Sequence, residues 1–223
     1  MSRQRTRYLE PMPLQNRVTP FGTLIIDSAR GAWMGNRGVL HDINRKLTGS
    51  RWTTLNWITC ALSFKNRHRK VMSPGRYSEL FFLDEATALA AGHRPCFECR
   101  RADAVAFRRA WADAFGVRRP AAEAMDRMIH PERKQPPCQR PRIGDAASLP
   151  DGAFLFQDHA PDTALLVLHR HLWRWTPTGY EAPVAASGQA GTLLTPPTSV
   201  VVLLAGYPVQ IHSSAHDKTG LVI

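Results

Sequence analysis

The segment that specifies the architecture most directly reads Glu79-Leu-Phe-Phe-Leu-Asp-Glu-Ala-Thr-Ala-Leu-Ala-Ala-Gly-His-Arg-Pro-Cys-Phe-Glu-Cys-Arg100. Residues 79–83 are apolar after the first glutamate, which predicts a short buried strand. Asp84 is a typical N-cap and Gly92 a typical residue just after a helix, so we expect a helix over 86–91. We interpret Asp84 and Glu85 as helix-capping residues rather than as an acid–base pair. The segment thus predicts a strand, a short helix and a Cys-x-x-Cys turn in succession.

Downstream of the turn, the apolar pattern changes to a helical period. Phe107, Trp111 and Phe115 recur four residues apart, which predicts an amphipathic helix over roughly 102–115. We interpret this aromatic stripe as core rather than as a base-stacking surface. Pro120 favours the start of another helix, which is expected to end before His130-Pro131.

Upstream of the segment, the sequence predicts two short strands separated by a loop. The strands fall within residues 23–27 and 55–62, which are apolar and bounded by polar residues or glycine. Residues 30–42 contain three glycines and many polar groups, so we expect a loop there.

The C-terminal third is predicted to be rich in β-structure. Residues 131–151 contain five prolines, which indicates a linker or a wrapped loop. Trp173 and Trp175 share one strand face and are interpreted as core. The strands expected beyond the linker cover 153–157, 164–170, 172–176 and 209–212, and a short helix is expected from Thr195 through Ala205, with Gly206 after it.

These elements together predict an α+β protein. We expect a basic, zinc-stabilised module over residues 1–130, the proline-rich segment 131–151, and a β-rich region over 152–223. A length of 223 residues fits one domain, or one domain with a smaller partner.

Charge is distributed unevenly along the chain. The formal net charge is +11, and residues 1–150 hold 26 basic and 13 acidic side chains, against 3 and 5 in residues 151–223. A positive field of this kind favours a polyanionic partner, and we expect nucleic acid, DNA in particular, ahead of an anionic membrane surface. An arginine-rich composition without any selected partner is the alternative.

Targeting signals and membrane spans are not predicted. The longest uncharged apolar stretch, 199–205, is too short to cross a bilayer, and the basic N-terminus is not followed by an apolar signal region. Four cysteines without such a signal indicate reduced thiols, and we expect a cytoplasmic protein.

Cys96 and Cys99 form the most specific chemical motif in the sequence. A Cys-x-x-Cys turn presents both sulfur atoms on its inner side, where they can hold one zinc ion with two further ligands. Thioredoxin-type redox chemistry is a weaker alternative, because here the motif lies between two helices rather than after a strand. Two unrelated buried thiols are the remaining alternative.

The segment from Phe82 to Arg100 resembles the metal-binding domain of the Ada DNA alkylation-repair protein family. The likeness rests on an apolar and aromatic strand, an Ala-rich helix that ends in Ala-Gly, and Arg-Pro-Cys-x-x-Cys. The upstream Trp57-Ile-Thr-Cys60 is similar to the strand in which that family places a C-x-x-x-C pair. The resemblance covers residues 55–101, less than a quarter of the chain.

The resemblance implies a DNA-bound zinc site made of cysteine thiolates. In that family the first cysteine of the C-x-x-x-C pair accepts a methyl group from a backbone phosphotriester, and Cys60 matches that position. Zinc would keep the thiol deprotonated, and nearby cations would hold the phosphate. The basic residues that follow Cys60 and fit this purpose are Lys65, Arg67, Arg69 and Lys70.

The chain departs from the family pattern at the fourth ligand. Phe64 stands where the second cysteine of the pair is expected, and a phenyl ring cannot bind zinc. We predict that Cys138 completes the site, with His68 as the next choice and His93 or an open position as alternatives. The predicted metal ligands are therefore Cys60, Cys96, Cys99 and Cys138.

The glycine-rich loop 30–42 is a second candidate site. Its arginine, asparagine and histidine side chains suit contacts to phosphates or base edges. His41 and Asp42 suggest the alternative of a metal-dependent nuclease, and a self-capped turn is the structural alternative. The residues assigned to nucleic-acid contact across both regions are Arg30, Asn36, Arg37, His41, Lys65, Arg67, His68, Arg69, Lys70 and Arg94.

Three functions follow as hypotheses. The first is a zinc-dependent DNA-binding protein related to alkylation repair, with Cys60 as ligand and alkyl acceptor. The second is a nuclease centred on His41 and Asp42. The third is a non-catalytic zinc module of a larger complex, with the β-rich region as its protein-binding face.

Overall fold

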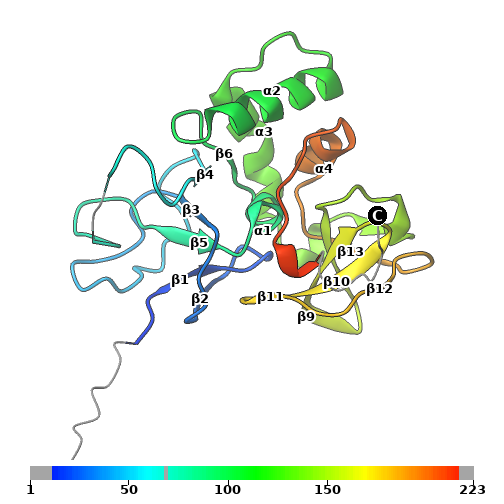
Figure 1. Cartoon of the computed structure of the whole chain (residues 1–223), viewed down its shortest axis with the longest axis horizontal. Helices are drawn as coiled ribbons and strands as arrows, with labels where there is room; N and C mark the ends of the chain where they lie inside the picture. The colour runs from blue at the N-terminus through cyan, green and yellow to red at the C-terminus, as the bar shows by residue number, and fades with distance from the viewer. Residues whose placement is uncertain (1–11, 68–69, 216–223) are drawn as a thin grey trace, which may run out of the picture.

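The computed structural model describes residues 12–67 and 70–215. Over these residues the chain forms two mixed sheets and a set of helices, which confirms the predicted α+β class (Figure 1). Helix α1 (Glu85–Ala90) lies between the two sheets and is buried along its whole length. The segment from which the sequence prediction began therefore occupies the centre of the molecule.

The first sheet brings the Cys-x-x-Cys turn beside an earlier strand. Its order is β2-β1-β5-β3-β4-β6, and β4 pairs in parallel with β6. This parallel pairing places Thr59 opposite Pro95. Cys60 and Cys96 are the next residues along each strand, so they lie at the same end of the two neighbouring strands. The strands are β1 (Gln15–Val18), β2 (Leu24–Ile26), β3 (Trp33–Asn36), β4 (Ile58–Cys60), β5 (Leu80–Phe82) and β6 (Arg94–Pro95).

Strand β3 corrects the expected loop at 30–42. It lies inside the sheet between β5 and β4, with Gly35 paired to both. A Cβ atom at Gly35 would lie 2.4 Å from the carbonyl oxygen of Ile58 and 2.8 Å from the ring of Phe82. The glycine that suggested a loop instead allows close approach of neighbouring backbone and side chain.

The helices largely follow their sequence signals. Asp84 caps α1 as predicted, because its carboxylate accepts a hydrogen bond of 2.8 Å from the backbone N–H of Thr87. Helix α4 ends just before the predicted Gly206, which has a positive φ of 87°. The remaining helices are α2 (Arg101–Phe115), α3 (Ala122–Lys134) and α4 (Pro197–Leu204), with short 3-10 turns at Pro137–Gln139, Ala146–Ser148 and Ser213–Ala215.

Helix α3 runs past the point where it was expected to end. Pro131 lies inside it, and the last turn continues to Lys134. Arg133 anchors this turn by donating hydrogen bonds of 2.8 Å to the carbonyl of Gly92 and 2.7 Å to that of Leu55. Tertiary contacts therefore outweigh the local effect of the proline.

The second sheet contains the predicted C-terminal strands. Its order is β11-β10-β9-β8-β13-β7, and β12 also pairs with β10. Residues 209–212 are not a strand, and the backbone N–H groups of Gln210 and His212 bond instead to the carboxylates of Glu85 and Asp84. The strands are β7 (Arg142–Ile143), β8 (Phe154–Gln157), β9 (Ala160–Leu168), β10 (His171–Thr176), β11 (Gly179–Tyr180), β12 (Val184–Ala185) and β13 (Gly191–Leu193).

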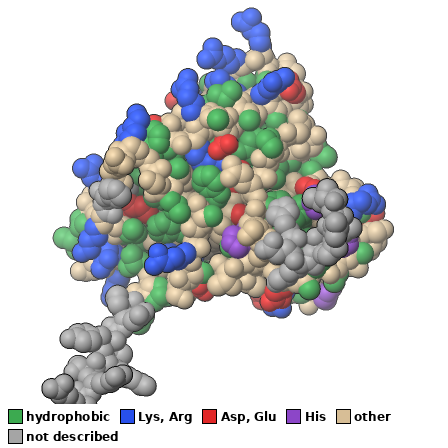
Figure 2. All heavy atoms as spheres, viewed as in Figure 1, with side chains coloured by type: hydrophobic (Ala, Val, Ile, Leu, Met, Phe, Trp, Pro, Cys, Tyr) green, Lys and Arg blue, Asp and Glu red, His purple; other side chains and the backbone are tan. Residues whose placement is uncertain are grey.

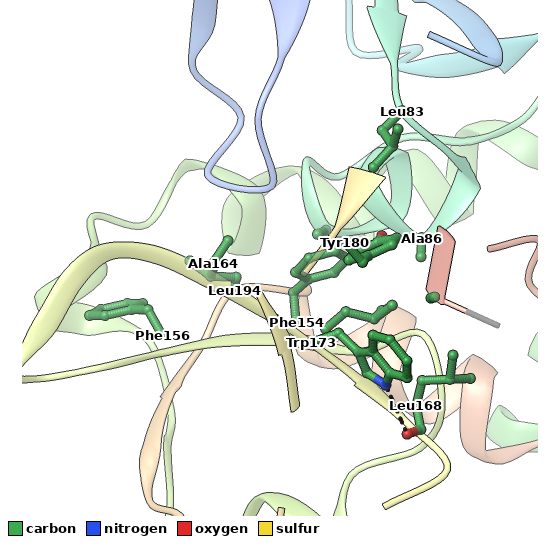
Figure 3. Packing of buried hydrophobic residues seen from close by; sticks show 12 residues of the cluster. Leu83, Ala86, Phe154, Phe156, Ala164, Leu168, Trp173, Tyr180 and Leu194 are labelled. Atoms are coloured by element: carbon green, nitrogen blue, oxygen red, sulfur yellow. Dashed lines mark hydrogen bonds between the residues drawn. The ribbon is translucent and has the colours of Figure 1, made fainter. Parts of the chain in front are cut away.

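The hydrophobic core is shared across the predicted boundary at 131–151. Leu83 and Ala86 pack in one cluster with Phe154, Trp173 and Tyr180 of the second sheet (Figure 3). A second cluster joins α2, α3 and α4, and it buries the predicted aromatic stripe of α2. Residues 131–151 therefore connect parts of one packed unit rather than two separate cores.

A search of the described residues finds no helix that is both apolar enough and long enough to cross a membrane.

Candidate metal centre

Three cysteine side chains converge at the end of the β4–β6 pair. The sulfur atoms of Cys60, Cys96 and Cys99 all lie within 4.8 Å of one another. Cys60 ends β4, Cys96 follows β6, and the turn before α2 brings Cys99 back toward them. Cys60 and Cys96 are buried, whereas Cys99 is half-buried. We call these three residues the thiol cluster.

The thiol cluster fits a zinc ion by its donor chemistry and spacing. Three thiolates are soft ligands that suit zinc, and tetrahedral geometry with Zn–S near 2.3 Å places sulfur atoms about 3.8 Å apart. The backbone N–H of Glu98 donates to the sulfur of Cys96 over 3.4 Å, which supports negative charge on that atom. Three of the four predicted ligands therefore lie close enough together to hold one metal ion.

Hydrogen bonds within the cluster separate the thiol pKa values. The pKa of Cys96 is lowered to about 2, chiefly because the side chains of Cys60 and Cys99 donate hydrogen bonds to it. The pKa of Cys60 is raised by its hydrogen bonds with Cys96 and Cys99, and then by burial. The cluster thus concentrates negative charge on Cys96 and leaves protons on its neighbours, which a bound cation would displace.

A cavity of about 390 Å³ opens directly on the thiol cluster. Its wall is mainly apolar, and two carboxylates, Glu79 and Glu98, also line it. Arg67 and Glu98 form an ion pair of 2.7 Å in this wall, with both side chains more than half exposed. Besides the three cysteines, the lining residues are Met34, Asn36, Ile58, Ala61, Leu62, Phe64, Arg67, Val71, Tyr77, Glu79, Phe81 and Glu98. We call this space the thiol cavity.

The predicted fourth ligand, Cys138, is not part of the cluster. It is exposed on the 3-10 turn Pro137–Gln139, and among the described residues no fourth cysteine, histidine or carboxylate joins the three thiols. Cys138 follows α3 (Ala122–Lys134) in the proline-rich loop. His93 is fully buried between Phe82 and Trp57, with ring centroids 4.7 and 5.3 Å away. His68 lies outside the described residues.

Several other predicted nucleic-acid contacts are exposed or half-buried, and some of them lie at the thiol cavity. Arg67 lines the cavity with Phe64, and the charged groups of Lys65 and Arg67 lie 5.1 and 5.4 Å from the centroid of the Phe64 ring. Asn36 lines the cavity, and Arg30 and Lys70 are exposed. Figure 2 shows Lys and Arg side chains gathered over the left and upper parts of the visible face. Arg69 lies outside the described residues.

Three other predicted contacts are buried and already bonded, so the structure contradicts their assignment to a nucleic-acid surface. Arg37 is 1% exposed and lies 4.2 Å from the ring centroid of Trp57. His41 bonds to the hydroxyl of Ser78 over 2.6 Å. The guanidinium of Arg94 donates two hydrogen bonds, of 3.0 and 2.6 Å, to the carboxylate of Asp126.

The neighbouring Asp42 supports the self-capped turn rather than a nuclease centre. Its Oδ1 accepts hydrogen bonds of 2.8 and 2.9 Å from the backbone N–H groups of Asn44 and Lys46. This pattern is that of an aspartate that closes its own loop. With His41 held by Ser78, both residues proposed for a nuclease serve the local fold.

Sequence reasoning missed two charged residues beside the site. Glu79 is 3% exposed, lines the thiol cavity and accepts a hydrogen bond of 2.7 Å from the backbone N–H of Met72. Arg100 directly follows Cys99 and pairs with Glu85 over 2.8 Å. The position of Arg100 directly after Cys99 could have indicated that it lies beside the site. No local sequence feature indicates that Glu79 lines the thiol cavity.

Comparison of the chain with protein-family models, with curated proteins and with solved structures gives no match.

Proposed function

We propose that this chain binds zinc through Cys60, Cys96 and Cys99 and accepts an alkyl group from DNA onto the Cys60 sulfur. The observation that carries the proposal is the convergence of three thiols at the base of a cavity of about 390 Å³. The resemblance of residues 55–101 to the Ada metal-binding domain supports the same reading. The open side of the cluster leaves room for a substrate beside the thiols.

The proposed reaction is a single nucleophilic displacement. When bound, the metal would keep the thiols deprotonated and nucleophilic and would offer a Lewis-acidic fourth position. The Cys60 sulfur attacks the alkyl carbon of a phosphotriester, forming a C–S bond as the C–O bond breaks. The electron pair of that bond leaves with the oxygen, so the product is a phosphodiester and an alkylated cysteine.

Exposed cations near the cavity would hold the DNA. Arg67 and Phe64 line the thiol cavity, and the charged groups of Lys65 and Arg67 lie 5.1 and 5.4 Å from the centroid of the Phe64 ring. Two cations beside this wall could contact the phosphates that flank an alkylated one. Arg67 must exchange its ion pair with Glu98 for such a phosphate, which makes Glu98 a competitor of the substrate.

Mass spectrometry of the intact protein and its peptides tests this function. After zinc loading and incubation with DNA that carries methyl phosphotriesters, the peptide that contains Cys60 should gain one methyl group per protein, without turnover. Cys60→Ser should abolish the gain, and the matched variant Cys138→Ser, which removes an exposed thiol outside the cluster, should retain it. Methylation of Cys138 alone, or of no cysteine in zinc-loaded protein, would exclude the proposal.

The position of Glu79 in the thiol cavity favours a second candidate function, metal-assisted hydrolysis of a nucleic-acid component. Three protein ligands with an open position are typical of catalytic rather than structural zinc sites, and a buried carboxylate in the same cavity can carry a proton. In this reaction water adds to the substrate, Glu79 takes the proton, and the proton passes on to the leaving group. Repeated turnover that Glu79→Gln abolishes while zinc content stays the same would select this candidate over alkyl transfer.

A further inference from the structure

A second cavity, of about 520 Å³, lies away from the thiol cluster. It is formed by the turn between β1 and β2, by Arg51, by the segment that follows α3, and by residues near the β8–β9 connection. It shares no lining residue with the thiol cavity. The residues that line it are Thr19, Phe21, Thr23, Arg51, Lys134, Gln135, Pro136, Pro137, Arg140, Phe156, Pro161 and Asp162.

The lining of this second cavity is strongly positive. Arg51, Lys134 and Arg140 contribute three cations, and Asp162 is the one acidic side chain among its lining residues. Within residues 12–67 and 70–215, none of the three cations forms an ion pair with a carboxylate. The pKa of Arg140 is lowered by burial and then by the charge of Arg51, as expected where cations face one another. Within the described chain, the cavity thus gathers three unpaired cations against one carboxylate.

Two buried arginines extend the positive charge behind the cavity wall. The guanidinium groups of Arg37 and Arg133 lie 4.2 and 4.0 Å from the ring centroid of Trp57. Arg37 donates a hydrogen bond of 2.9 Å to the carbonyl of Gly22, in the same turn that lines the cavity. Burial, and then the charges of Arg133 and Arg51, lower the pKa of Arg37 to about 9. An anion in the cavity would relieve this repulsion.

A buried hydroxyl in the lining lacks a hydrogen-bond partner. Thr19 is 9% exposed, and its Oγ1 bonds to no atom of the described chain. A buried hydroxyl without a partner is destabilising because it has lost its hydrogen bonds to water, so it is seldom retained unless something else bonds to it. In a cavity rich in cations, a hydroxyl donor adds a further contact for an anionic oxygen.

The same cavity has an apolar side. Phe21 and Phe156 both line it, with ring centroids 5.9 Å apart, and three prolines continue this surface. Inorganic phosphate would leave these rings without contact. A ligand that pairs a phosphate with a planar ring would satisfy both the cations and the aromatic side.

We propose that the second cavity binds a free mononucleotide. Its phosphate contacts Arg51, Lys134, Arg140 and the hydroxyl of Thr19, and its base packs on Phe21. The volume of about 520 Å³ lies within the usual range for small-ligand sites. The proposal does not depend on the thiol cluster, because the two cavities have separate linings.

Isothermal titration of the full chain tests the site with three probes: 5′-AMP, inorganic phosphate and adenosine. The nucleotide should bind most tightly, phosphate more weakly, and adenosine not measurably. Cys60→Ser should leave the affinity for 5′-AMP unchanged, so failure of the alkyl-transfer proposal and failure of this one are distinguishable. Absence of 5′-AMP binding to the unmodified chain would overturn the proposal.

Two variants and one control locate the binding. Thr19→Val keeps the side-chain shape, and Lys134→Gln changes an exposed residue, so each should fold normally and lose about tenfold in affinity for 5′-AMP. Arg127→Gln removes a cation from the same helix as Lys134 but outside the cavity, and it should bind as the unmodified chain does. Unchanged affinity in both test variants overturns the site. A single-stranded oligonucleotide that binds more tightly than 5′-AMP, and loses affinity in Thr19→Val, would assign the cavity to a nucleic-acid strand and overturn the free-nucleotide proposal.

Discussion

The acidic start of α1 and the thiol cluster lie close in sequence and differ in how their polar atoms are used. Asp84 and Glu85 are buried, and every carboxylate oxygen has a protein partner. Tyr180 and Tyr207 donate hydroxyl groups to them over 2.7 and 2.6 Å, and Arg100 pairs with Glu85 over 2.8 Å. We call this set the polar network.

The thiol cluster has the opposite character. Its three sulfur atoms bond mainly to one another and face a cavity, with one backbone N–H donated to Cys96. Groups whose partners all come from the chain stabilise the fold, whereas donors and acceptors that converge on open space are poised to bind something else. This contrast indicates that Asp84 and Glu85 stabilise the fold, whereas the cysteines are available to bind a ligand.

Loss of one thiol should produce the largest effect. Cys96→Ser should weaken zinc binding on the order of a thousandfold, because thiolates supply most of the binding free energy at such a site. Chelator competition with a colorimetric zinc indicator measures this change. Equal weakening of zinc binding in Cys138→Ser, which alters an exposed cysteine, would contradict the assignment of metal binding to the thiol cluster.

Disruption of the polar network should reduce stability rather than metal binding. Glu85→Ala leaves the buried Arg100 paired with Asp103 alone and removes the acceptor of Tyr207, so the free energy of unfolding should fall by about 3 kcal/mol. Urea denaturation followed by circular dichroism measures the loss. Glu181→Ala, which removes an exposed partner of Arg174, should cost less than about 1 kcal/mol. Equal losses in the two variants would contradict the assignment.

Acid should weaken the contact between His130 and Arg133, which lies beside Trp57. Burial, then Arg133 and Lys134, lower the pKa of His130 to about 4, and its Nδ1 accepts a hydrogen bond of 2.8 Å from Arg133. The unfolded chain then binds this proton at higher pH than the folded chain does, so stability falls as pH drops from about 6.5 to 4.

Replacement of this histidine isolates its contribution. His130→Asn retains an acceptor for Arg133 but cannot titrate, so its stability should vary less with pH over the same interval. Urea midpoints at several pH values between about 4 and 6.5 measure the slope. A slope identical to that of the unmodified chain would show that other groups carry the pH dependence.

The smallest predicted effect concerns the ion pair at the thiol cavity. Glu98→Gln releases Arg67, so affinity for duplex DNA at low salt should rise about two- to threefold, with a steeper salt dependence. Fluorescence anisotropy at several salt concentrations measures both quantities. Glu181→Gln makes the same change in net charge away from the cavity and serves as the control. Equal effects of the two variants would indicate net charge alone.

Local signals made α1, α2 and the Cys-x-x-Cys turn predictable. Asp84 and Gly92 mark the ends of α1, and the period of Phe107 and Trp111 gives the buried face of α2. Each of these depends on residues within one or two helical turns. The convergence of Cys60 with the turn was predicted through the family resemblance, and the parallel pairing of β4 with β6 provides its structural basis.

Features that depend on distant packing were not predictable. Glycine among polar residues is typical of a loop, whereas the close approach of Gly35 to Ile58 exists only in the assembled sheet. Arginine is usually exposed, so the sequence predicts surface positions for Arg37 and Arg94, and their burial depends on Trp57 and Asp126. Residue type alone predicts Cys138 as a ligand. Its exposed position depends on the 3-10 turn Pro137–Gln139.

The polar network has a consequence for the order of events during synthesis. Tyr207 and Gln210 reach Glu85 across 122 and 125 residues, whereas the thiols all lie between positions 60 and 99. Contacts of long sequence separation form late, because the intervening chain must first close a large loop. The nascent chain can therefore gather its three sulfur atoms around an ion while α1 still lacks its partners from residues 207–212. Metal capture would then precede final closure of the core and help to nucleate it.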